Sequence, residues 1–467
     1  MMAKLTLFLQ RYWETTKILV PMALNIALSF AISTSLSIFL LALVGRNDTT
    51  ASAAMGLFNL YNAVTGVAFC SGFLSAQSTL SSYAFGRYEK ALQCHPVDLT
   101  STTSHLYSLS RICQRACFMM FLALFPISAF WLTSEPILLR LGQDSAVAAL
   151  VGSFNRIYLP FFPFFVLTTI LKNHLQAQRL TGPVIWSTLI ANVLAGILGY
   201  ILIYHTSLQT TGFPIAFGSA SVLNFVILLV YIIRKGTVWK WITLSELFER
   251  GETLEFISLG FPGAIILFAE WLGFEIHSFF AGWIGTTTLA AQAILLNTNF
   301  MAFSLPLGQS IAANVMVGIE EGKDQREEAK WISEVALING FLSAVVISVV
   351  YWTCHAVWGQ IFTSDPSVVA LVAQILPVMG VFVFSDFTGN VVGGVLRGLK
   401  LYKTGAAVNV ISFYGVGITL GYLLAFKADW GLSGLWAGLA AASGVNCLTL
   451  LIILRVYFWY NRDRTVE

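Results

Sequence analysis

Three carboxylic acids lie deep inside long apolar stretches of this 467-residue chain: Glu270, Glu275 and Asp386. An ionised carboxylate at mid-depth in a bilayer costs roughly 2.5–3.5 kcal/mol, so such residues normally face a protein interior or a water-filled cavity. Several carboxylates around one poorly hydrated cavity cannot all stay ionised unless a cation joins them. The three acids therefore predict a site at which protons and an organic cation compete for the same oxygens.

Glu270 and Glu275 share one apolar stretch, residues 262–285, and are close in sequence. At about 100° per residue their side chains point roughly 140° apart on a regular helix, so one cavity cannot face both equally. Pro262 and Gly273 leave room for a bend that would reduce this angle. The alternative is that one of the two acids, more readily Glu275, is a buried hydrogen-bonding residue that holds helices together.

Polar and aromatic residues near these acids could line the same cavity. His277 is either a proton relay two turns after Glu270 or a packed histidine. Aromatic rings such as Trp271 offer a cation–π surface for a flat amphiphilic ligand, although ordinary packing explains most rings in so aromatic a chain. The cavity-lining candidates are Trp271, His277, Asn297 and Asn390, the last one turn after Asp386.

The composition is that of an integral membrane protein, with 57% hydrophobic and 10% charged residues and a mean hydropathy of +0.76. The even balance of 26 Lys and Arg against 23 Asp and Glu does not indicate a nucleic-acid partner. Six scattered cysteines give no disulfide framework and no zinc spacing. The sequence contains no HExxH, G-x-S-x-G or Walker motif. We therefore expect that the protein is not an enzyme and that it has no metal site and no cofactor.

Apolar runs long enough to cross about 30 Å of hydrocarbon number twelve, which predicts an all-α fold of twelve transmembrane helices. If the N-terminus is cytoplasmic, only Arg46, Arg140, Arg156 and Lys427 of the 26 basic residues fall outside, as the positive-inside rule requires. Both termini are then cytoplasmic. The predicted spans are 17–44, 51–83, 107–133, 147–172, 182–204, 212–234, 254–284, 287–318, 331–362, 366–396, 403–426 and 431–458.

The two halves of the chain repeat one another. Each half holds six spans, an even number, so the halves are related by a pseudo-two-fold axis along the membrane normal. This predicts a first lobe at 1–234, a cytoplasmic linker at 235–253 and a second lobe at 254–467. The matching positions are Pro21 and Pro262, Gly86 and Gly318, Arg179 and Lys400, and Gly199-Tyr200 and Gly421-Tyr422.

Two further segments carry weaker signals. The linker mixes charges with Trp239, Trp241, Leu244 and Phe248, which is typical either of an interfacial amphipathic helix or of a plain cytoplasmic connection. Asn47-Asp48-Thr49 matches a glycosylation sequon on the predicted outer side, in a very short loop.

Together these features resemble the multidrug and toxic compound extrusion (MATE) family, specifically its eukaryotic branch, over nearly the whole chain. The most specific match is Pro262 followed by Glu270 and Glu275 and closing at Gly285, in the pattern P-x7-E-W-x3-E. Further matches are AAQAI at 290–294, GGVLRG at 393–398 and WGLSGLWAGL at 430–439.

The resemblance implies a V-shaped pair of six-helix lobes and proton-driven export of organic cations, xenobiotics or secondary metabolites. By position it assigns proton and substrate binding to Glu270, Glu275 and Asp386. Asn297 stands where animal members carry another Glu, which weakens the expectation of binding to polyvalent cations. The first helix lacks the acid of bacterial members, which argues against sodium coupling.

The function expected from the sequence is thus a monomeric proton antiporter that works by alternating access in the plasma membrane or in a vacuolar or other endomembrane. The alternative is a lipid-linked oligosaccharide flippase of the same superfamily, which would prefer a basic cavity, whereas no Lys or Arg lies deep in a predicted span. A major facilitator fold would carry a G-x3-D-R-x-G-R-like loop after its second helix, where this chain has FGRYEKALQ. A membrane scaffold would move no substrate.

Overall fold

The computed structural model describes residues 2–45, 49–93, 99–235 and 241–460. Every regular element in these ranges is helical, and they contain no strand. The Asn47 sequon lies outside the described residues. The helices are α1 (Met2–Gly45), α2 (Thr49–Asn62), η1 (Ala63–Val67), α3 (Ala68–Gln93), α4 (Leu99–Leu132), α5 (Ser134–Arg140), α6 (Ser145–Tyr158), α7 (Phe162–Ala177), α8 (Gly182–Tyr204), η2 (Gln209–Thr211), α9 (Gly212–Arg234), α10 (Leu244–Leu247), α11 (Arg250–Ile284), α12 (Thr286–Gly322), α13 (Arg326–Trp358), η3 (Gly359–Ile361), α14 (Pro366–Gly398), α15 (Tyr402–Val410), η4 (Ile411–Ile418), α16 (Thr419–Tyr422), η5 (Leu423–Lys427) and α17 (Gly431–Tyr460).

Eleven helical segments of the described chain are long and apolar enough to cross a membrane, and the bent pair α6 and α7 makes a twelfth. These two helices are bent by 57° at their junction. Pro160 in the junction and Pro163 in the first turn of α7 have no backbone N–H to continue a helical ladder. The prediction of twelve spans is confirmed, and the fourth span is a broken helix.

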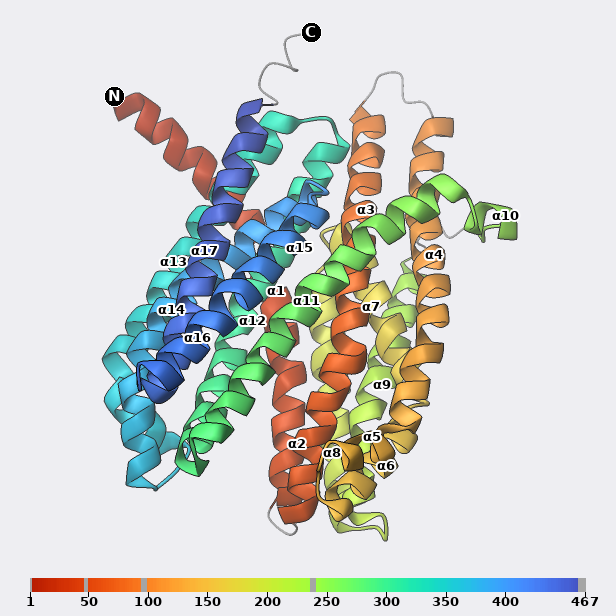
Figure 1. Ribbon diagram of the computed structural model, residues 1–467. Helices are drawn as coiled ribbons and strands as arrows, with labels where there is room; N and C mark the ends of the chain where they lie inside the picture. Colours follow the sequence, from red (N-terminus) through yellow and green to blue (C-terminus); the bar gives the residue numbers. More distant parts are fainter. Residues whose placement is uncertain (1, 46–48, 94–98, 236–240, 461–467) are drawn as a thin grey trace. The chain divides into compact units, whose positions relative to one another are not determined.

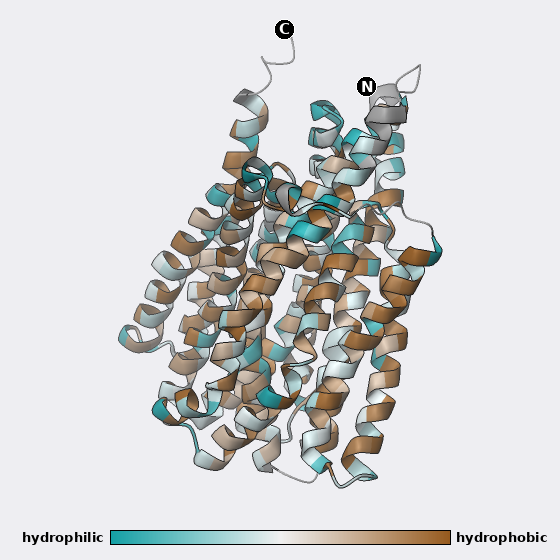
Figure 2. Ribbon diagram, turned by 90° about the vertical axis from the view of Figure 1, so that its right-hand side faces the viewer, coloured by the Kyte–Doolittle hydropathy of each residue, from teal (hydrophilic) through white to brown (hydrophobic). Residues whose placement is uncertain are grey.

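Hydropathy follows the helices as a membrane solvent requires. Figure 2 shows hydrophobic residues along the lengths of the helices and hydrophilic residues gathered at helix ends and in connections. Exposed side chains on the long helices include Trp186, Phe279 and Trp352, which are large and apolar. In lipid such residues need no cover, and every backbone polar group is satisfied within its helix.

The described chain forms two compact units. One unit holds Met1–Ala27 with Ile265–Glu467, and the other holds Leu28–Ala264. In the first unit α14 packs against α12, α13 and α17 around a core that includes Phe382, Phe387 and Trp436. In the second unit α3 packs against α4 and α7, and α8 packs against α9.

The unit boundaries cut α1 and α11, the first helix of each half of the sequence. Residues up to Ala27 of α1 belong with the second half of the chain, whereas residues up to Ala264 of α11 belong with the first half. Each cut lies a short distance after one of the matching prolines, Pro21 and Pro262. The predicted lobes, 1–234 and 254–467, stay a prediction, and the compact units have different limits.

The internal repeat reappears in local backbone structure. Arg179 and Lys400, which the sequence matches, both adopt φ of 60° immediately after α7 and α14. After α7 the Leu180 N–H donates to the Leu175 carbonyl at 2.9 Å, and after α14 the Leu401 N–H donates to the Leu396 carbonyl at 2.8 Å. Both helices therefore end in the same Schellman-type cap.

The helix that carries Asp386 has a defined beginning. Asp365 caps α14, because its carboxylate accepts the Ser367 backbone N–H at 2.9 Å, and Pro366 occupies the first helical position. The Ser367 hydroxyl donates to the same oxygen at 2.6 Å, and these hydrogen bonds lower the pKa of the Asp365 carboxyl. The cap fixes where α14 starts.

Candidate functional site

Glu270 of α11 and Asp386 of α14 are buried near each other inside one unit of the protein. Each side chain is buried, with 5% of its surface exposed. The two carboxyl groups are close enough to interact electrostatically. Of the three acids singled out by the sequence, the structure therefore brings these two together, from helices more than one hundred residues apart.

A guanidinium group joins the acid pair. Arg397 interacts electrostatically with Glu270. Arg397 lies on α14 with Asp386. At about 100° per residue, the spacing from 386 to 397 places the two residues on nearly the same face of the helix, roughly 16 Å apart along its axis. Sequence reasoning assigned Arg397 to a helix end and missed it. The sequence spacing between Asp386 and Arg397, which places both on one helix face, was the signal from which Arg397 could have been predicted.

Hydrogen bonds connect this face of α14 to α12. The Asn390 side-chain amide donates to the Asp386 carbonyl at 3.2 Å and lies 3.5 Å from Asp386 Oδ2. Ser310 Oγ donates to the Asn390 carbonyl at 2.6 Å and accepts from Arg397 Nη2 at 2.7 Å. Asn390 and Ser310 thus form a polar path that runs from Asp386 to Arg397.

Glycine allows α12 and α14 to come this close. A methyl group at Gly394 would overlap the Ser310 backbone carbonyl and would lie 2.7 Å from Ser310 Oγ. On another side of α14, a methyl group at Gly389 would contact Cys447 of α17 at 3.4 Å, and Ser385 Oγ lies 2.6 Å from Ser443 Oγ of α17. The acid pair is therefore set in a tightly packed group of helices.

Glu275 is placed differently. α11 runs as one continuous helix through Gly273 (Figure 1), so the angular separation of a regular helix holds between Glu270 and Glu275. The Glu275 side chain is half-buried. In the part of the chain that the structure describes, it makes no hydrogen bond or ion pair. The structure therefore does not bring it to the acid pair.

The cavity-lining candidates have separate environments. The His277 ring is fully buried, with Nδ1 2.9 Å from the Gly273 carbonyl, and among the described residues Nε2 has no hydrogen-bond partner. A methyl group at Gly421 would lie 3.0 Å from that Nε2. Asn297 is exposed and donates to the Ala293 carbonyl of its own helix at 2.9 Å. Trp271 is half-buried, and Asn390 belongs to the acid site.

Among the described residues, no group of three or more His, Cys, Asp or Glu side chains could hold a metal ion. The two carboxyl groups of the acid pair are of the type that can bind a proton or a cation, and one guanidinium group lies beside them. The local charge of the group depends on how many protons the two carboxyls hold.

Comparison with known proteins decides the family. The MatE family model matches residues 104–201 and 262–423, more than half of the chain. The chain belongs to the MatE family. This confirms the resemblance found in the sequence and excludes the major facilitator fold.

Relatives in animals and a solved structure agree with this assignment. Multidrug and toxin extrusion protein 1 of Xenopus tropicalis is 32% identical over 461 residues, which cover 97% of this chain and 76% of the relative. The protein of that name from Mus musculus is 30% identical over 402 residues, covering 85% and 67%. The crystal structure of the eukaryotic MATE transporter AtDTX14 has a TM-score of 0.86 at 24% identity, covers 95% of this chain and 96% of that one, and shows the same fold.

As a MatE protein, the chain is a multi-pass membrane transporter of the multidrug and toxin extrusion type. Its relatives are transporters rather than enzymes, and they imply small-molecule substrates.

Proposed function

We propose that this MatE protein is a secondary antiporter that exports organic cations and amphiphilic xenobiotics or metabolites in exchange for protons. The observation that carries the proposal is the burial of Glu270 and Asp386 together, beside Arg397. Two carboxylates in a poorly hydrated site cannot both be ionised without compensation. A proton and a cationic substrate are the two groups that can provide it.

Charge counting at this site suggests how the exchange proceeds. Two carboxyls that share one proton carry one negative charge, which Arg397 balances, so the proton-loaded group is neutral. Loss of the proton leaves one net negative charge, which attracts a monovalent cation. Reprotonation from the opposite side then expels the cation. We therefore propose one proton for each monovalent cation.

Each carboxyl has a distinct part in this scheme. Glu270 balances the charge of Arg397. It lies on α11, which the unit boundary divides at Ala264, so its charge acts close to the point where the chain passes from one unit to the other. Asp386 lies at the other end of the polar path through Asn390 and Ser310. We propose Glu270 and Asp386 as the proton site and Glu275 as a secondary contact for the substrate.

Alternating access between two lobes would move the site from one side of the membrane to the other. We propose that the termini face the cytoplasm, since the basic residues concentrate on that side of the predicted topology, and that the transporter works as a monomer in the plasma membrane or an endomembrane. Arg397 does not support the flippase alternative, which would prefer a basic cavity. The guanidinium of Arg397 interacts with Glu270 and Ser310.

Purified protein in liposomes tests the proposed function. A panel of organic cations, organic anions and neutral flavonoid-like compounds is offered with a pH gradient, with a sodium gradient and with neither. We expect uptake of cations driven by the pH gradient and unaffected by sodium. Uptake driven by sodium alone, or transport of lipid-linked pyrophosphates in place of cations, would overturn the proposal.

A further inference from the structure

Two buried asparagines in the second half of the chain have amide oxygens that lack a hydrogen-bond donor. Asn409 lies on α15 and is 7% exposed, and Asn446 lies on α17 and is 9% exposed. Among the described residues, no group donates to Oδ1 of either side chain. A buried acceptor without a donor costs free energy, so these two oxygens require an explanation. The two residues are called the asparagine pair below.

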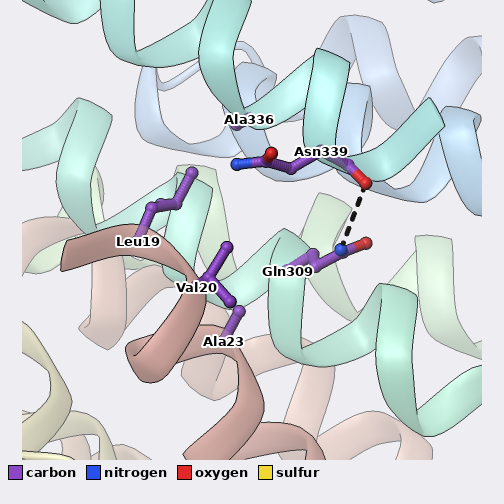
Figure 3. A pocket seen from close by; sticks show the side chains of 6 residues that line it. All are labelled: Leu19, Val20, Ala23, Gln309, Ala336 and Asn339. Atoms are coloured by element: carbon purple, nitrogen blue, oxygen red, sulfur yellow. Dashed lines mark hydrogen bonds between the residues drawn. The ribbon is translucent and has the colours of Figure 1, made fainter. Parts of the chain in front are cut away.

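Amide groups elsewhere in the same unit do have partners. Figure 3 shows Gln309 of α12 donating to the Asn339 carbonyl of α13 at 3.4 Å, beside a small crevice. Gln309 Oε1 accepts from Ser343 Oγ at 3.0 Å, and Asn339 Oδ1 accepts from Tyr12 OH at 2.6 Å. The missing donors on α15 and α17 are therefore not a general property of the amides in this unit.

Asn446 lies close to Asp386 along the contact between α14 and α17. Three residues before Asn446, Ser443 Oγ lies 2.6 Å from Ser385 Oγ of α14. The residue after Asn446, Cys447, interacts electrostatically with Asp386. Asn446 is therefore within one helical turn of the level of Asp386.

The faces of α17 show where the Asn446 side chain points. Ala442 packs against η4, because a methyl group at Gly417 would lie 2.9 Å from Ala442 Cβ, whereas Ser443 faces α14. At about 100° per residue, Asn446 lies roughly 40° from Ala442 and roughly 60° from Ser443, in the sector between them. Its side chain therefore points between η4 and α14.

Asn409 lies at the level of the acid on α11. A methyl group at Gly405 of α15 would lie 3.7 Å from Ile266 Cδ1 of α11, and a methyl group at Gly421 of α16 would lie 3.0 Å from His277 Nε2 of α11. α11 and the helix from α15 to α16 therefore run side by side in the same direction. Asn409 lies one turn after Gly405, and the acid of α11 lies one turn after Ile266, so the two are at one level.

The sequence repeat places residues of the same kind in the first half. The offset between Arg179 and Lys400 matches Thr188 of α8 with Asn409, and the offset between the two Gly-Tyr pairs matches Asn224 of α9 with Asn446. In the first half Asn224 Nδ2 donates to Thr188 Oγ1 at 3.2 Å. The matching positions thus face each other across two neighbouring helices there.

The first half has no acids around this polar pair. The repeat matches Glu270 with Ser29 and Asp386 with Phe165. α8 is a regular α-helix, whereas its counterpart changes from α15 to the π-helix η4, and π-helical turns are frequent at functional sites. The acid pair, the asparagine pair and the π-helix therefore occur together at one place in the second half, and the matching place in the first half has none of the three.

We propose that Asn409 and Asn446 are positioning residues of the proton site, each of which accepts a hydrogen bond from the O–H group of its neighbouring acid when that acid holds the proton. The inference rests on the proton site proposed above. An ionised carboxylate has no hydrogen to donate, so the amide oxygens lack a donor only while the acids are ionised. Protonation supplies the donor, and the hydrogen bond favours the proton-loaded form.

Other groups near the acid pair also influence proton binding. The charged and titratable side chains around it come from the four helices α11, α14, α15 and α17: His277, Arg397, Tyr402 and Cys447. The described residues of α12 and α13 bring no charge to the pair, and α12 contributes the uncharged Ser310. The variants below leave all these groups unchanged, so altered proton binding in them reports on the asparagines.

Infrared difference spectra of the protein in liposomes, recorded over a pH titration, test the proposal without any substrate. A protonated carboxyl has a C=O stretching band that a carboxylate lacks, and the band moves to higher frequency when the O–H group loses its hydrogen-bond partner. The bands of the site are those that disappear in Glu270→Gln and Asp386→Asn. Asn409→Val and Asn446→Val remove the amide oxygens. We expect the band of the neighbouring acid to move to higher frequency and its half-maximum to require roughly two- to tenfold more protons, which is a lower pH.

Two kinds of control variant accompany the titration. Asn409→Thr and Asn446→Thr have the shape of the Val variants but keep an oxygen that can accept, so they should bring the band and the midpoint back toward those of the unmodified protein. Asn224→Val removes an amide oxygen that also lacks a donor among the described residues, in the half without the acids, and should leave band and midpoint unchanged. If a Val variant does not fold, the Ala variant at the same position replaces it.

The outcomes separate this inference from the proposed function. Unchanged bands in the Val variants, equal shifts in the Val and Thr variants, or an equal shift in Asn224→Val would overturn the role of the asparagines while the proton site stands. If no titrating band disappears in the acid variants, the proton site and this inference fall together. The expected shifts in a protein that exchanges no proton for a cation would support the inference and overturn the antiport mechanism.

Discussion

In the proposed mechanism, Arg397 sets the charge that the buried acid pair carries. Without it, two carboxyls sharing one proton would be a net anion in the proton-loaded state. With it, that state is neutral, and one net negative charge arises only when the proton leaves. Ser310 holds the guanidinium in place, since it accepts from Arg397 Nη2 and donates to the Asn390 carbonyl. Ser310 is thus a positioning residue for the charge at the site.

Replacing Ser310 by Ala tests this role. The change removes two hydrogen bonds, which costs about 0.5–1.5 kcal/mol for each bond, and lets the guanidinium move relative to Glu270. We expect proton-coupled uptake to fall roughly three- to tenfold at normal protein abundance. Uptake is measured in liposomes.

The matched control for Ser310 is Ser304→Ala on the same helix. Ser304 donates to the Met301 carbonyl of its own helix at 2.9 Å, so its loss should leave uptake unchanged. Equal loss in the two variants would show that Ser310 has no special part in positioning Arg397.

Among the individual residues of the site, the sequence predicts some better than others. Glu270 and Asp386 stand out because a buried acid in an apolar span is rare and costly. Arg397 does not stand out, because a basic residue near a span end is expected anyway. Ser310 and Asn390 act through partners on another helix, and no local sequence pattern predicts such a partner. Glu275 stays a prediction as a site residue.

Among the helices, α1 and α11 differ from the rest because each belongs partly to both units. α11 carries Glu270 shortly after its boundary. The proposed proton site at Glu270 therefore lies on one of the two helices that both units share.

The contact of α1 with α12 depends on Gly308. Replacing it by Ala puts a methyl group into the Ala23 carbonyl, and overpacking of this kind costs about 1–3 kcal/mol. We expect a lower melting temperature in detergent and reduced transport.

Gly56→Ala on α2 is the control, because a methyl group there meets nothing within 4 Å and Ala is favoured over Gly in a helix by roughly 0.5–1 kcal/mol. Equal melting temperatures for the two variants would argue that the α1 and α12 backbones are not in tight contact in the membrane protein.

The spans themselves are largely predictable from apolar run length and the alternation of basic residues, because a bilayer forces both patterns. The break at Pro160 is less predictable, because the apolar run continues through this residue and predicts a single span at 147–172. The ion pair of Arg11 with Glu328 lies further from prediction, because the two residues are more than three hundred positions apart. In the sequence, each has the context of an ordinary solvated charge.

For the whole molecule, we propose that the charge of the acid pair governs one transport cycle. The neutral, protonated site permits reorientation without a buried net charge, and so does the site that holds a cation. The empty, deprotonated site carries a net negative charge, which makes its passage through the low-dielectric interior costly. In the proposed antiport, this difference couples proton movement to substrate movement and prevents a leak of either.

The central claim is that Glu270 and Asp386 bind the transported proton. Its most direct test is the change of pH inside liposomes when a monovalent organic cation is added outside, measured together with cation uptake. We expect about one proton per cation for the natural protein and roughly tenfold or greater loss of both fluxes in Glu270→Gln and Asp386→Asn, which keep the side-chain volume but cannot titrate. Glu275→Gln should retain most of the flux, because Glu275 lies apart from the pair. Proton exchange at the rate of the unmodified protein in both the Glu270 and the Asp386 variants, at equal protein content, would contradict the account and place the proton site elsewhere.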